Sequence, residues 1–127
     1  MTSVPSRRSR TAAGTGAGVV GGLVGAGVVV LTALTVAGSL ALGWSWGDAL
    51  ESFALSNGLI GLSFGVCGAV LTWHRPRNAV GWLLLAGGAC HAVAAFCAPL
   101  AGLLVVGEAP TWLLRTVATV FVYSWPW

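Results

Sequence analysis

The chain has 127 residues, of which 57% are hydrophobic and only 7% are charged, and its formal net charge at pH 7 is +3. Soluble domains carry about 25% charged residues, so the composition excludes a water-soluble globule and indicates a protein whose solvent is the bilayer. Since a spanning helix needs roughly 20 apolar residues, the length allows four such helices with short loops and leaves no room for a soluble catalytic domain.

Residues that could form a catalytic, metal or nucleic-acid site are equally sparse. The basic excess comes from six arginines set against three acids, which is too few for a surface that follows nucleic-acid phosphates. No nucleic-acid partner is therefore expected. The three cysteines lie singly within apolar runs and lack the spacing of a metal site. We expect no catalytic residue, no cofactor and no metal.

Residues 1–17 are rich in Ser, Thr, Gly and Arg and show no hydrophobic period, which predicts a flexible basic tail. Residues 18–42 carry no charge and are long enough to cross a bilayer. An uncleaved first helix is favoured over a secretory signal peptide, because this run exceeds the ~7–15 apolar residues of a signal sequence. A twin-arginine export signal at Arg7 and Arg8 is the weaker alternative.

Three further apolar runs follow, each bounded by polar or helix-breaking residues. A connector with two tryptophans and two acids precedes the second predicted helix, residues 53–73. Pro76 ends that helix, and the third is predicted over residues 79–106. Pro110 suits the start of a fourth helix over residues 111–127, which is at the lower length limit for a span. The sequence thus predicts an all-α integral membrane protein, about four transmembrane helices in an antiparallel bundle covering residues 18–127.

The charges divide between the two sides of this bundle. Five of the six arginines lie in the tail or in the 74–78 connector, whereas the three acids lie in the other two connectors. Arginines near helix ends are retained in the cytoplasm, so we expect a multi-pass plasma-membrane protein with both termini cytoplasmic. Six tryptophans fall at the ends of the apolar runs, as expected for an interfacial aromatic belt; these are Trp44, Trp46, Trp73, Trp112, Trp125 and Trp127.

Glycines four residues apart mark candidate packing faces. Gly18 and Gly22 share one face of the first helix, and Gly61 and Gly65 share one face of the second. Such spacing lets two backbones approach closely in a membrane. The alternative is a chance match in a chain with 19 glycines. The partner of these faces is left open: another helix of this chain, a second copy, or another membrane protein besides the lipid bilayer itself.

His91 is the one titratable nitrogen base near the middle of a predicted span, where a polar side chain requires a partner. We expect an intramembrane hydrogen bond to another helix, with Ser63 and Thr72 as candidate partners. A proton-transfer or ligand role is the alternative. No paired acids and no nucleophile motif accompany His91.

Residues 71–88 contain a distinctive turn and helix start: Arg75, Pro76, Arg77 and Asn78, followed by Gly81 and Trp82. This segment resembles the N-terminal membrane segment of actinobacterial sensor histidine kinases of two-component systems, in which an Arg-Pro-x-Asn turn precedes a Gly-Trp-Leu-Leu-Leu helix start. The resemblance implies a membrane-embedded input or anchoring module in signal transduction. The kinase domains of that family do not follow here, so the chain is expected to be a non-enzymatic fragment. The alternative is a small stand-alone accessory that packs against another membrane protein.

Overall fold

The computed structural model describes residues 7–124, with side chains from residue 16 onward, and it is helical throughout with no strand in that part of the chain. Five helices follow in order: α1 (Arg7–Ala41), α2 (Trp46–Glu51), α3 (Ala54–His74), α4 (Ala79–Val106) and α5 (Thr111–Tyr123). The predicted all-α helical fold is confirmed. Residues 79–106 were expected as one helix and form α4 with the same bounds.

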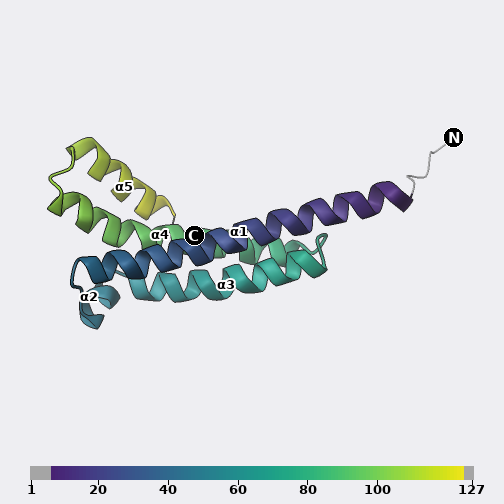
Figure 1. Ribbon diagram of the computed structural model, residues 1–127, viewed down its shortest axis with the longest axis horizontal. Helices are drawn as coiled ribbons and strands as arrows, with labels where there is room; N and C mark the ends of the chain where they lie inside the picture. Colours follow the sequence, from purple (N-terminus) through teal and green to yellow (C-terminus); the bar gives the residue numbers. More distant parts are fainter. Residues whose placement is uncertain (1–6, 125–127) are drawn as a thin grey trace.

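Three helices make the body of the molecule. The apolar stretches Gly16–Ala41, Ala54–His74 and Ala79–Val106 are each long enough to cross a membrane. At 1.5 Å per residue, the 21 residues of α3 extend about 31 Å, which matches the hydrocarbon thickness of a bilayer. The chain is therefore a multi-pass membrane protein. Figure 1 shows α1, α3 and α4 running alongside one another.

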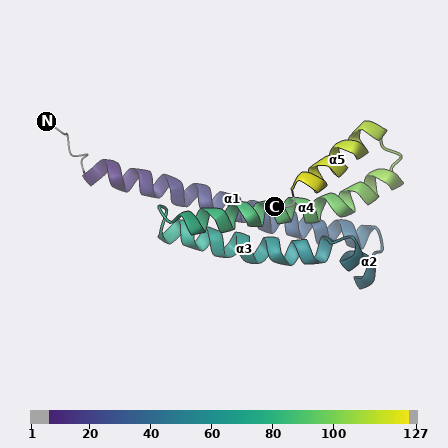
Figure 2. The ribbon, with the colours of Figure 1, turned by 180° about the vertical axis from the view of Figure 1, so that it is seen from behind.

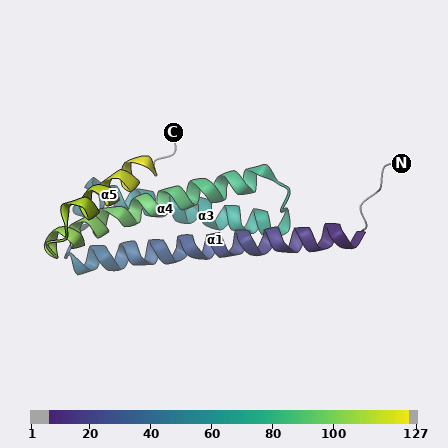
Figure 3. The same cartoon turned by 90° about the horizontal axis from the view of Figure 1, so that it is seen from above.

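The fourth predicted span is shorter than expected. The helix at this position, α5, has 13 residues and extends only about 20 Å, less than the roughly 30 Å of a bilayer core. It packs on α4 and turns back along it from the α4–α5 loop (Figures 1 and 3). The remaining part of the predicted helix, residues 125–127, lies outside the described residues.

Two further elements differ from the expected boundaries. Helix α1 begins at Arg7, although residues 1–17 were expected to form a flexible tail; residues 1–6 lie outside the described part. The 44–52 connector contains the short helix α2, which a capping box stabilises: Asp48 N donates to Ser45 Oγ at 3.3 Å, and Ser45 N donates to Asp48 Oδ2 at 2.7 Å.

The fold separates the charges at its two ends. The end of α1 with Arg7, Arg8 and Arg10 extends past the α3–α4 turn, where Arg75 and Arg77 lie. At the opposite end, α2 carries Asp48 and Glu51, and the α4–α5 loop carries Glu108. Figure 2 shows these two groups of loops at opposite ends of the bundle.

Candidate functional site

Residues 75–82 form a closely bonded turn between α3 and α4. Arg75 ends α3, its N–H donating to Leu71 O at 2.7 Å. Asn78 begins α4, and its Oδ1 accepts a hydrogen bond from Val80 N at 3.1 Å. This bond satisfies one of the free amide groups at a helix start. The turn therefore has a defined end to one helix and a defined start to the next.

Trp82 closes this turn from the side of α4. Its indole Nε1 donates to Pro76 O at 2.9 Å, so the first turn of α4 is tied back to the loop. Gly81 lets the two helices meet just behind the turn, since a Cβ there would lie 3.0 Å from Leu71 Cβ. The sequence marks Asn78 as part of this turn, but nothing in its spacing indicated the indole bond to Pro76.

The glycine face of α3 packs against α4, backbone to backbone. A Cβ added at Gly61 would lie 2.8 Å from Ala92 N, and one at Gly68 would lie 2.5 Å from Leu85 N. A Cβ at Gly88 would lie 2.7 Å from Gly65 Cα. These distances are below the ~3.5–4.0 Å of an optimal carbon contact. Only glycine fits at these positions, and the partner of this face is another helix of the same chain.

Helix α1 packs on the hairpin formed by α3 and α4, where its glycines meet small side chains of α3. A Cβ at Gly25 would lie 2.6 Å from Ala69 Cβ, and Gly21 lies directly against the Thr72 hydroxyl. The predicted pair Gly18 and Gly22 lies beside Trp73, with ordinary contact distances of 3.7 Å. The tighter α1 contact is made by Gly21 and Gly25, a second glycine pair with the same four-residue spacing.

His91 makes its polar contact with a residue that sequence reasoning missed. Its Nδ1 lies 2.9 Å from Asn57 Oδ1, which places an interhelical hydrogen bond between α4 and α3. Ser63 and Thr72, the expected partners, donate instead to carbonyls of their own helix, Leu59 O at 2.8 Å and Gly68 O at 2.9 Å. A hydroxyl can satisfy itself within its helix in this way, so neither side chain requires His91.

Asn57 is only 4% exposed, and its Nδ2 has no hydrogen-bond partner. The other flank of His91 is the ring of Phe64, edge-on at a centroid distance of 6.4 Å. Within the described residues, no group of three His, Cys, Asp or Glu side chains could hold a metal ion. The Asn57–His91 pair links α3 and α4, and the amide nitrogen of Asn57 is left without a hydrogen-bond partner.

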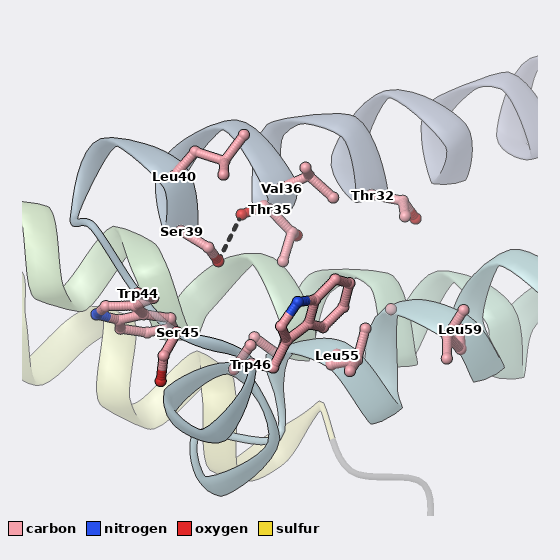
Figure 4. A pocket seen from close by; sticks show the side chains of 13 residues that line it. Thr32, Thr35, Val36, Ser39, Leu40, Trp44, Ser45, Trp46, Leu55 and Leu59 are labelled. Atoms are coloured by element: carbon pink, nitrogen blue, oxygen red, sulfur yellow. Dashed lines mark hydrogen bonds between the residues drawn. The ribbon is translucent and has the colours of Figure 1, made fainter.

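A groove of about 340 Å³ opens between α1 and α3 at the acidic end of the bundle, and α2 lies across its end (Figure 4). Three hydroxyl residues of α1 line it, Thr32, Thr35 and Ser39, and each donates to a carbonyl one turn earlier at 2.9 Å. The hydroxyl protons are thus used within the helix, and the rest of the lining is mainly apolar.

Comparison with known proteins gives no match. No protein family, no curated protein and no solved structure is similar to this sequence. The bundle, its bonded turn and its groove therefore define the chain as a multi-pass helical membrane protein, and its function rests on the geometry of these features.

Proposed function

We propose that this chain is a membrane-embedded input and anchoring module of a signalling protein, of the kind that precedes the catalytic domains of sensor histidine kinases. The observation that carries the proposal is the bonded turn at residues 75–82. The residues that resemble the kinase segment are the ones joined by the Asn78 cap and by the hydrogen bond from Trp82 to Pro76. The module performs no catalysis itself: its helix packing biases kinase domains elsewhere in the signalling protein.

The alternative function is an accessory that binds another membrane protein through its glycine faces, and the α3 face does not favour it. Gly61 and Gly65 are buried within the bundle, against α4 and against Val28 of α1. They present no free surface to an outside helix. The glycine face of α3 is therefore engaged within the chain, which favours the input module over the accessory role.

The arginine end of the bundle faces the cytoplasm of the plasma membrane in this proposal. Five arginines at one end and three acids at the other match the retention of basic loops inside the cell. Helix α1 begins at the arginine end, and α5 turns back along α4 toward that end, which supports a C-terminus on the same side.

This orientation can be tested with single cysteines in a variant that lacks the three native ones. His74→Cys reports the arginine end and Gly47→Cys reports the acidic end; both positions are exposed. An impermeant maleimide applied to intact cells should label the residue-47 variant alone. Labelling of the residue-74 variant alone would reverse the orientation.

The signalling role is tested by purifying the tagged chain from the membranes of the cell that encodes it, after crosslinking. A protein carrying a histidine-kinase domain should be recovered, either as a partner or within the same polypeptide. The autophosphorylation of this kinase domain should change when Trp82→Ala is introduced into the turn. An unrelated three-span protein with the same tag is the control. Recovery of no kinase above that control, with no kinase domain encoded in the same reading frame, would refute the proposal.

A further inference from the structure

The groove between α1 and α3 has the shape of a site for one hydrocarbon chain. It follows α1 from Thr32 to Leu40, about 12 Å along the helix axis. Its walls include Val36 and Leu40 of α1 with Leu55 and Leu59 of α3. Val36, Leu40 and Leu59 are 55%, 71% and 58% exposed, so the groove opens sideways to the lipid. A chain can therefore enter from the bilayer without crossing water.

The acidic end of the groove is closed by groups of a different character. Trp44, Ser45, Trp46 and Ala49 line it there, and Figure 4 shows Trp46 between the hydroxyl-bearing turns of α1 and Leu55. Trp46 is 77% exposed, which leaves its ring available to a bound group. An indole face attracts an ammonium cation.

A carboxylate is hydrogen-bonded to one of the residues that line this end of the groove. Ser45 Oγ donates to Asp48 Oδ2 at 2.8 Å, which joins the lining of the groove to the acid. The hydrogen bonds from the Ser45 side chain and backbone lower the pKa of Asp48 from its usual value of 3.8, so the carboxylate stays ionised at neutral pH. Glu51 lies on the same helix, and the basic residue of this end, Arg115, lies on α5, which packs on α4. The charge at the groove is therefore negative.

From these observations we infer that the groove binds a single-chain amphiphile with an ammonium head, which enters sideways from the lipid. The alkyl chain lies between α1 and α3, and the head group lies against Trp46 and beside Asp48. An anionic head group of the same size would be repelled by the same carboxylate. This binding site is independent of the proposed signalling role, because occupancy is measured on the chain itself with no kinase present.

The test uses the full chain in nanodiscs and a photoreactive alkyl-trimethylammonium probe with the diazirine in its tail. Crosslinks should concentrate on residues 36–40 and 55–59. Unlabelled alkyl-trimethylammonium should compete about two- to fivefold better than an alkyl sulfate of equal chain length, the factor expected of one exposed cation–π contact. Asp48→Asn should reduce this preference for the cationic competitor.

Ala49→Phe fills the groove from α2 and should remove the focused crosslinking. Ala33→Phe is the matched control, because Ala33 is exposed on α1 and does not line the groove. If A49F does not fold, Val36→Trp blocks the same groove from a lipid-facing position. Crosslinks spread evenly over the lipid-facing helices would overturn the site, and equal competition by the two amphiphiles would overturn the ammonium assignment.

Discussion

Gly88 and Gly87 are adjacent residues of α4 that differ in what surrounds them. A Cβ at Gly88 would be in direct contact with the Gly65 N and would lie 2.7 Å from Gly65 Cα and 2.9 Å from Gly61 O. All three are backbone atoms, so no side chain can rotate away. A Cβ at Gly87 would meet only Phe64 Cδ2, at 3.7 Å, which is an ordinary contact. Replacing each glycine by alanine in turn therefore compares the same chemical change in two settings.

In Gly88→Ala the two helices must separate by about 1 Å, because a carbon contact is optimal at ~3.5–4.0 Å. A gap of this size forfeits a quarter to a half of each dispersion contact along the face. We expect Gly88→Ala to lower the free energy of unfolding by about 1–3 kcal/mol. Gly87→Ala should leave it unchanged or raise it by up to about 1 kcal/mol, since alanine favours the helix.

The assay is reversible unfolding of the purified protein in mixed micelles with increasing SDS, followed by far-UV circular dichroism. The difference between the two variants removes the effect of alanine on helix propensity, which both share. Equal stability of Gly88→Ala and Gly87→Ala would refute the backbone contact between α3 and α4. A stabilised Gly88→Ala would refute it more strongly.

Three other predictions concern hydrogen bonds. A double-mutant cycle of Asn57→Ala and His91→Ala, measured by SDS unfolding, should give a coupling free energy of about 0.6 kcal/mol, up to ~1.7, as for other interhelical hydrogen bonds in membranes. Zero coupling would contradict the hydrogen bond between these two side chains. Trp82→Phe should lower the free energy of unfolding by about 0.5–1.5 kcal/mol and speed hydrogen exchange at the 75–82 turn. Trp73→Phe, at an exposed position, is the control. Unchanged exchange in Trp82→Phe would exclude a role for the indole bond. Because the pKa of Asp48 is lowered below 3.8, its contribution to the α2 cap is present above that pH and lost as the pH falls through the lowered value. The fluorescence of Trp46 should change as the unsubstituted protein is acidified through this pH, whereas the Asp48→Asn variant should show no such transition. Identical acid titration curves for the two proteins would argue against the cap.

The boundaries that were predicted well have local chemical signals. Asn78 and Pro76 mark the α3–α4 turn in the sequence itself, and α4 begins and ends where expected. The start of α1 was missed because a Ser-, Thr- and Arg-rich composition indicates a tail, whereas a helix already nucleated by the apolar run extends through such residues to Arg7. The α2 capping box was present as Ser45 and Asp48 but was overlooked.

The contacts between helices could be predicted only in part from the sequence. Glycine spacing identified the α3 face at Gly61 and Gly65, yet spacing alone does not tell which of several glycine pairs on α1 meets the hairpin. The groove was not predicted, because it depends on how α2 folds across the gap between two helices. Asn57 was missed because a polar residue near the start of a span resembles an ordinary helix end, and only the fold brings it to His91.

The contact between α3 and α4 has a mechanical consequence. At Gly61, Gly68 and Gly88 the two backbones meet without intervening side chains, which leaves little room for one helix to shift against the other at these positions. The α1 contact, by comparison, includes side chains of Thr72, Ala69 and Val28, which allow small sliding movements. The interface between α1 and this hairpin is therefore the one along which small shifts between helices meet the least resistance from backbone atoms.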